Sequence, residues 1–157
     1  FDKENLMYKI INMLDYSEGL DKAISFYHAK WGKPNNLSFF KDVITHSSKA
    51  KSGIPRFYLL MKENEIVGCI GLAINDLISR QDLFPWIIGV YIVKSERGQQ
   101  LGNFMMKHVE SEAKNAGFNT VYLTTELDRY YEKYGWIRIE DGYEFTGETT
   151  KMYRKEL

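Results

Sequence analysis

A glycine-containing loop between two apolar segments constrains the fold of this 157-residue chain more than any other feature. Before the loop, residues 86–93 read Trp-Ile-Ile-Gly-Val-Tyr-Ile-Val and are apolar on both alternating faces, which is typical of a strand in the centre of a sheet. After the loop, apolar residues recur at helical spacing over residues 101–116, and a β-rich run follows over residues 118–124. A strand, a helix and a strand in this order predict one crossover unit with two parallel strands.

The remaining periodicity predicts further strands and helices around this unit. Strands are expected over residues 6–16, 56–62, 66–74, 137–145 and 149–153. Helices are expected over residues 20–31, from residue 35 or 36 to 46, and over residues 128–134. Ser17 is a candidate cap of the first helix, and Gly32 is its expected end. The polar turn at residues 63–65 predicts an antiparallel hairpin, and Gly89 is the expected site of a bulge.

Length and composition are those of one globular domain that spans residues 1–157. No segment repeats, and none has the composition of a linker. Hydrophobic residues make up 44% of the chain and charged residues 27%, yet no apolar run approaches the ~20 residues that span a bilayer. Because the first residues also lack a secretory leader, we expect a cytoplasmic protein with no membrane partner.

Charge and cysteine content exclude other classes of function. The 21 basic and 21 acidic residues give a formal net charge of zero, which argues against a nucleic-acid partner. Cys69 is the only cysteine and lies in the apolar run 66–70, so we expect a buried, inert thiol rather than a nucleophile or a disulfide. His28, His46 and His108 show no ligand spacing, and no metal is expected.

The loop Arg97-Gly98-Gln99-Gln100-Leu101-Gly102 leads into the N-terminus of the predicted helix, where an anion is favoured. The first N–H groups of a helix have no intrahelical acceptor, and the helix dipole places roughly half a positive charge there. Gly98 and Gly102 would let backbone nitrogens approach phosphate oxygens closely, and Arg97 would add a charged donor. Taken alone, such a loop is more often a plain turn into a helix.

A second motif downstream makes the loop far more specific. Tyr131-Glu132-Lys133-Tyr134-Gly135-Trp136 follows the predicted strand 118–124. Together the two motifs resemble the GNAT acetyltransferase superfamily, over about residues 86–136 by motif and over the whole chain by element order. The resemblance implies a mixed α/β (α+β) fold, with a mostly antiparallel central sheet of six to seven strands, flanking helices and a parallel central strand pair. It also implies acetyl-CoA as cosubstrate and an enzyme that transfers the acetyl group to an amine.

The resemblance also assigns site residues position by position. Backbone groups of Val90, Tyr91 and Ile92 would pair with the pantetheine arm. The residues implied to hold the pyrophosphate are Arg97, Gly98, Gln99, Gln100, Leu101, Gly102 and Asn103. Tyr131 falls where the family has a tyrosine near the cofactor sulfur, assigned as the acid that protonates the departing thiolate. The alternative for Tyr131 is one more aromatic ring packed against the sheet.

Three positions depart from the family pattern. Gln100 stands where a glycine is most frequent, and its side chain would cost ~1 to 2 kcal/mol in a left-handed conformation. Either its φ is negative or cofactor binding is weaker. Lys94 replaces a frequent proline. Thr124 replaces an asparagine that often contacts the cofactor, although its hydroxyl is still suited to such a contact.

The general base is less well defined by the sequence. Glu126 is the candidate because it follows the strand 118–124, at the end where a cofactor crevice should open. Asp128 and Glu96 compete with it, and each of the three is also an ordinary solvated carboxylate. A chain of water molecules is a further alternative that needs no dedicated side chain.

The expected acceptor is a primary amine of a small molecule or a peptide. Aromatic residues that either line its pocket or belong to the core are Trp86, Tyr130, Tyr134 and Trp136. Asp76 and Asp82 would attract a cationic amine. The alternative function is a non-catalytic CoA-binding sensor or interaction module on the same fold, which Gln100 and the lack of an evident base leave open. The oligomeric state also stays open, with a homodimer among the alternatives.

Overall fold

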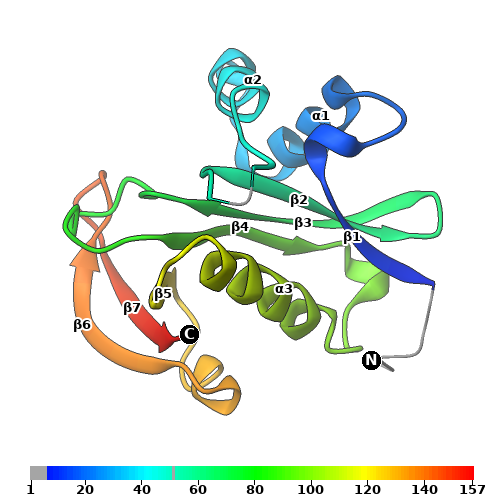
Figure 1. Cartoon of the computed structure of the whole chain (residues 1–157). Coiled ribbons are helices and arrows are strands. Elements are labelled where there is room, and N and C mark those ends of the chain that lie inside the picture. Colours follow the sequence, from blue (N-terminus) through cyan, green and yellow to red (C-terminus); the bar gives the residue numbers. More distant parts are fainter. Residues whose placement is uncertain (1–6, 51) are drawn as a thin grey trace.

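The computed structural model describes residues 7–50 and 52–157, which form a seven-stranded sheet with the order β1-β2-β3-β4-β5-β7-β6 (Figure 1). The strands are β1 (Tyr8–Asn12), β2 (Arg56–Lys62), β3 (Glu65–Ala73), β4 (Trp86–Ile92), β5 (Thr120–Thr125), β6 (Ile137–Tyr143) and β7 (Thr149–Glu156). The helices are α1 (Leu20–Trp31), α2 (Leu37–Thr45) and α3 (Leu101–Asn115), with 3-10 turns at Met13–Asp15, Lys94–Glu96 and Tyr131–Tyr134. Neighbouring strands are antiparallel except β4 and β5, which are parallel. The predicted fold class is confirmed.

Helices cover both faces of the sheet. α3 packs on one face, and α1 and α2 pack on the other (Figure 1). The core under α3 includes Leu101, Met105 and Val109, which follow the helical stripe predicted from the sequence. The core on the opposite face includes Ile24 of α1 and Ile44 of α2. Among the helices of the described residues, none is long and apolar enough to cross a membrane.

Cys69 lies in the core between β3 and the helices α1 and α2. Its side chain is fully buried, as the sequence predicts. Burial raises the pKa of the thiol to about 12. The thiol therefore stays protonated at neutral pH, and the thiolate form that reacts as a nucleophile is absent.

The first strand is shorter than the sequence predicts. β1 ends at Asn12 rather than at residue 16, because the Asn12 side chain accepts a hydrogen bond from the Leu14 N–H (2.9 Å) and starts a 3-10 turn. Leu6, the predicted first residue of this strand, lies outside the described residues. The hydrogen bond between the Asn12 side chain and the nearby backbone therefore ends the strand, although the apolar pattern continues to residue 16.

The sequence predicts Ser17 as the cap of α1 and Gly32 as its end, and only the second prediction is right. Ser17 does not cap the helix, which begins after Gly19, whose φ is 101°. Such a φ suits glycine, which has no Cβ to clash. The predicted end at Gly32 is confirmed. The helix predicted over residues 128–134 is only the 3-10 turn Tyr131–Tyr134. The other predicted strands and helices agree with the structure to within three residues at each end.

β4 and β5 are paired only at the start of β4. The structure pairs Trp86 with Tyr122 and no later residues of these two strands. Trp86 and Ile87 are buried, but β4 is only half-buried from Ile88 onward, because β5 no longer covers that edge. The prediction of a strand buried on both faces is therefore wrong for the second half of β4. A strand edge left open inside a sheet has backbone groups available to a ligand.

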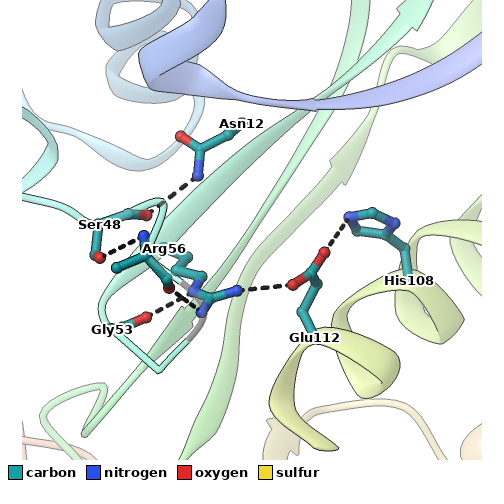
Figure 2. Close-up of polar contacts among 7 residues, drawn as sticks. Asn12, Ser48, Gly53, Arg56, His108 and Glu112 are labelled. Carbon is teal, nitrogen blue, oxygen red and sulfur yellow. Dashed lines mark hydrogen bonds and ion pairs between the residues drawn. The ribbon is translucent and has the colours of Figure 1, made fainter. Parts of the chain in front are cut away.

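A buried arginine holds the segment between α2 and β2 (Figure 2). Arg56 is 3% exposed and donates from Nε to the Gly53 carbonyl (2.6 Å) and from Nη1 to Glu112 Oε2 on α3 (2.7 Å). Asn12 of β1 donates from Nδ2 to the Ser48 carbonyl (3.1 Å). These contacts tie the segment to β1, β2 and α3 at once.

Candidate active site

The loop between β4 and α3 has the geometry of an anion site. Gly98 has a φ of 85°, and a Cβ added there would meet no heavy atom within 4 Å. A Cβ at Gly102 would meet only Ile92 Cδ1, at 3.8 Å. No side chain caps α3, and the Phe104 N–H donates to the Gln100 carbonyl, so the N–H groups ahead of Phe104 have no intrahelical acceptor. The loop therefore has both the open space and the donors that an anion needs.

Gln100 takes the left-handed conformation, with a φ of 61° and a ψ of 23°, so the alternative of a negative φ is wrong. We expect Gln100→Gly to raise the free energy of unfolding by up to about 1 kcal/mol, because relief of ~1 to 2 kcal/mol of strain outweighs the extra freedom of glycine in the unfolded chain. Urea unfolding measures this change. Gln100→Ala keeps the Cβ and should show no gain. An equal gain in both variants would contradict strain at this residue.

Glu96 anchors the loop to the opposite edge of the sheet. The Tyr8 hydroxyl donates to Glu96 Oε2 (2.5 Å), Lys62 Nζ donates to Oε1 (2.8 Å), and Gln99 Nε2 donates to Oε2 (3.2 Å). The bonds from Lys62 and Tyr8 lower the pKa of Glu96. Glu96 is buried and ionised among these donors, so it serves the loop and is not available as the base that competes with Glu126.

β4 is bulged at Gly89, as the sequence predicts. The pairing with β3 places Gly71 opposite Ile88 but Cys69 opposite Tyr91, so β4 contains one extra residue between these pairs. Gly89 has a φ of 62°, in the left-handed region that favours glycine. The bulge lies where β4 has already lost its pairing with β5.

Two side chains from α1 enclose the bulge. Trp31 Nε1 donates to the Gly89 carbonyl (3.1 Å). A Cβ at Gly89 would lie 2.3 Å from the hydroxyl oxygen of Tyr27, which is a severe clash. A glycine at this position therefore lets Tyr27 approach the backbone of β4.

Beyond the bulge, the edge of β4 faces the gap beside β5. The Val93 N–H donates to a carbonyl of β3, and because backbone groups alternate along a strand, those of Ile92 and Val90 point away from β3. Tyr91 is paired with β3 instead. The Ile92 carbonyl accepts a hydrogen bond from Arg97 Nε (2.9 Å), which keeps the exposed Arg97 beside this edge.

Two cavities meet at Val90 and Tyr131. A slot of about 50 Å³ reaches the start of α3 and is lined by Val90, Gly102, Asn103, Met106, Tyr130, Tyr131, Tyr134 and Trp136. A cavity of about 440 Å³ is lined by Tyr27, Trp31, Phe40, Asp76, Ile87, Ile88, Gly89, Val90, Leu123, Thr124, Thr125, Tyr131 and Glu144. Because Val90 and Tyr131 belong to both linings, the slot and the cavity adjoin at these two residues.

Tyr131 is half-buried at the junction of the two cavities. Its ring packs against the rings of Trp136 and Tyr153, with centroid distances of 6.2 and 5.9 Å. Burial, with a smaller contribution from the charge of Tyr130, raises the pKa of Tyr131 to about 12. The ring packs against the sheet, as expected for a structural aromatic residue. Tyr131 also borders both cavities, as a residue near the cofactor sulfur has to.

Two carboxylates line the larger cavity. Asp76 follows β3 and Glu144 follows β6, and a backbone bridge between Ile78 and Glu144 brings the two segments together. Asp76 borders the open cavity, but neighbouring protein atoms shield its carboxyl from much of the water. This burial raises the pKa of Asp76 to about 6, and the negative charge of Glu144 raises it further. In the part of the chain that the structure describes, no Lys or Arg lines the cavity. The cavity is therefore suited to a cation.

The other acidic candidates lie outside this lining. Glu126 is exposed after β5, and its backbone carbonyl accepts a hydrogen bond from Lys151 Nζ (2.9 Å). Asp128 forms an ion pair with Lys151 (3.1 Å), and Asp82 forms one with Arg80 (2.8 Å). Asp82 therefore does not contribute to the cavity as expected. Glu126 as the base stays a prediction, which the pH dependence of turnover by Glu126→Gln tests.

The aromatic candidates divide between the core and the slot. Trp86 is fully buried in the core. Tyr130, Tyr134 and Trp136 line the slot rather than the larger cavity, whereas Thr124 lines the larger cavity. Within residues 7–50 and 52–157, no group of three or more His, Cys, Asp or Glu side chains is placed to hold a metal ion. The slot therefore has an aromatic wall next to the loop before α3.

An open β4 edge, a glycine loop at the start of α3 and a slot between them are the layout of an acyltransferase domain. Residues 11–136 match the acetyltransferase (GNAT) family, and the chain belongs to this family. A comparison with curated protein sequences finds no match. The family predicted from the two motifs is confirmed.

Solved structures share this fold. A GNAT family acetyltransferase from Elizabethkingia anophelis with acetyl-CoA bound has a TM-score of 0.66 and 16% identity, over 96% of this chain and 99% of that chain. An aminoglycoside 6'-N-acetyltransferase complexed with coenzyme A has a TM-score of 0.69 and 15% identity, over 94% of this chain and 96% of that chain. An IAA acetyltransferase from Bacillus cereus ATCC 14579 has a TM-score of 0.62 and 12% identity, over 96% of this chain and 99% of that chain. At these identities the likeness shows the fold.

Proposed function

We propose that the protein is an acetyl-CoA-dependent N-acetyltransferase that acetylates a primary amine of a small molecule or a peptide. The observation that carries this proposal is the junction at Val90 and Tyr131, where the slot from the loop side meets the acidic cavity. Two reactants held at one junction react as if at far higher concentration than in solution. Membership of the family and the two similar structures that hold acetyl-CoA or coenzyme A support the same cosubstrate.

The residues around the slot fit acetyl-CoA. Gly98 and the free N–H groups at the start of α3 would hold the pyrophosphate, with Arg97 as a charged donor. Backbone groups of Val90 and Ile92 on the open edge of β4 would pair with the pantetheine amides, as an added strand would. Bound acetyl-CoA supplies a thioester whose carbonyl carbon an amine can attack. Asn103 and Tyr131 line the slot through which the pantetheine arm would reach the cavity.

The reaction forms a C–N bond and breaks a C–S bond. The electron pair of the broken bond stays on sulfur and the amine nitrogen loses a proton, so a thiolate has to be stabilised and then protonated. Tyr131 has a pKa of about 12, and a proton transfer from it to a thiolate of pKa ~8.5 would be uphill by about 5 kcal/mol. Tyr131 therefore acts as a hydrogen-bond donor to the thiolate. The proton that the amine loses passes to Glu126 or to water, and water returns a proton to the sulfur.

Tyr131→Phe is expected to lower kcat by about 10- to 100-fold, because a hydrogen bond to a charged group contributes ~1.5–3 kcal/mol. The KM for acetyl-CoA should change little, since the ring and its packing remain. Steady-state thiol release measures both constants. Tyr143→Phe, at an exposed tyrosine on β6, is the matched control and should behave as wild type. An unchanged kcat in Tyr131→Phe would remove this residue from the mechanism.

A CoA-binding sensor or interaction module without turnover is the alternative function. The observation that favours it is the position of the predicted base, since Glu126 is exposed and does not line the larger cavity. Calorimetric titration with acetyl-CoA, followed by thiol release across a panel of primary amines, separates the two functions. Binding with amine-dependent thiol release supports the enzyme, whereas tight binding without thiol release from any amine supports the module.

A further inference from the structure

The hydroxyl of Tyr27 is an unpaired polar group beside the larger cavity. Tyr27 is 4% exposed, and its ring packs against Phe40 and Phe57 at centroid distances of 5.7 and 5.4 Å. Tyr27 also lines the cavity, and within the described residues its hydroxyl has no hydrogen-bond partner. The ring is buried, but the hydroxyl oxygen is not among the fully buried atoms that lack a partner, so it reaches the cavity, where an atom of a ligand can pair with it.

The position of this hydroxyl is fixed by the bulge of β4. It lies 2.3 Å from where a Cβ of Gly89 would be, so it sits directly over the backbone next to Val90. Val90 is one of the two residues shared by the slot and the cavity. The Tyr27 hydroxyl therefore lies at the end of the cavity where an acetyl group from the slot would arrive.

The cavity also holds the two carboxylates of Asp76 and Glu144. Neither forms an ion pair with another of the described residues. Burial raises the pKa of Tyr27, and the charges of Cys69 and Asp76 make smaller contributions in the same direction. Apolar side chains, among them Ile87 and Ile88, line the same space. The lining of one cavity thus combines a hydroxyl beside Val90, apolar side chains and two carboxylates without a cationic partner among the described residues.

We infer that the acceptor is a compact aliphatic diamine whose reacting amino group contacts the Tyr27 hydroxyl, while Asp76 and Glu144 bind its second amino group as an ammonium ion. This inference rests on the proposed function. A reacting nitrogen has to be neutral to attack a thioester, so it does not balance the carboxylates, whereas a second ammonium group does. Methylene groups between the two nitrogens would contact Ile87 and Ile88.

The test compares 1,4-diaminobutane with butylamine, which has the same carbon chain and one amino group. Wild-type protein is expected to show a kcat/KM at least about tenfold higher for the diamine, because the carboxylates recognise only its second ammonium group. The double variant Asp76→Asn/Glu144→Gln should reduce this preference to about twofold or less. Asp82→Asn, on the same segment but outside the cavity, is the matched control and should keep the full preference.

Tyr27→Phe tests the reacting end separately. Its hydroxyl has no hydrogen-bond partner among residues 7–50 and 52–157, so the melting temperature should stay at the wild-type value. The kcat should fall about tenfold for both amines alike, because each presents the same reacting group to this hydroxyl. A variant that keeps the wild-type kcat for both amines would remove Tyr27 from the acceptor site.

Equal kcat/KM values for the two amines in the wild type, or a preference that survives in the double variant, would overturn the inference. If no amine is acetylated, the proposed function fails, and calorimetric titration with 1,4-diaminobutane then decides the inference by itself. Binding to the wild type that is lost in Asp76→Asn/Glu144→Gln supports the diamine site. Absence of binding to the wild type overturns it.

Discussion

Gly89→Ala is expected to lower the free energy of unfolding by about 2–5 kcal/mol, the sum of left-handed strain and overpacking. Gly89 has a φ of 62°, and the new Cβ would lie 2.3 Å from the Tyr27 hydroxyl and 2.7 Å from two ring carbons. The Tyr27 ring is held by Phe40 and Phe57, so it cannot move aside without disturbing the core. The proposed acetyl transfer should be lost as well, because Gly89 lines the larger cavity next to Val90, which also lines the slot.

The control for Gly89→Ala is Gly117→Ala, after the end of α3. Gly117 has a φ of 99°, and a Cβ there would meet no heavy atom within 4 Å, so this variant should lose only the strain contribution of ~1–2 kcal/mol. Urea unfolding measures both variants. Adding Tyr27→Phe to Gly89→Ala should recover part of the lost stability, since it removes the atom in the shortest contact. Equal losses at Gly89 and Gly117, with no recovery, would contradict the contact.

Arg56→Met is expected to lower the free energy of unfolding by about 2–4 kcal/mol, because two backbone carbonyls and the partly exposed Glu112 carboxylate lose a buried donor. Arg56 bonds Glu112 Oε2 and the carbonyls of Gly53 and Ala50, and all three acceptors lose their donor (Figure 2). A domain of this size has a total stability of ~5–15 kcal/mol, so the loss is a large fraction. The segment before β2 should detach from α3, and proteolysis there should become faster.

Lys41→Met is the matched control for Arg56→Met. Lys41 Nζ lies 3.6 Å from Asp21 Oδ1, and both side chains are largely exposed. Exposed pairs contribute ~0–1 kcal/mol because water and salt screen them. Chemical denaturation should therefore show a large loss for Arg56→Met and almost none for Lys41→Met. Equal losses of unfolding free energy in the two variants would contradict a larger stabilising contribution from the buried Arg56.

Local patterns in the sequence predict most of the fold. The apolar run of β4, the stripe of α3 and the polar turn between β2 and β3 each act within one or two elements, so their residues alone define them. Gly89 and the loop before α3 were predictable for the same reason, since a bulge and a helix start depend on nearby residues. Asp76 was also predictable as an acidic residue in the polar segment after β3.

Contacts between distant segments were not predictable from such patterns. Glu144 reaches the cavity only because its segment is bridged to Ile78, which nothing in either segment indicates. Tyr27 looks like a core residue of α1, and its unpaired hydroxyl becomes visible only where α1 crosses the bulge. The half-buried end of β4 likewise depends on where β5 turns away after Tyr122. These features depend on tertiary packing, which overrides local preference.

The most direct test of acetyl transfer is mass spectrometry of primary amines incubated with the protein and acetyl-CoA. We predict that the mass of at least one amine rises by one acetyl group, that the product requires the protein, and that Tyr131→Phe forms it far more slowly. An unchanged amine in every case, from a protein that binds acetyl-CoA by calorimetry, would contradict the assignment as an acetyltransferase.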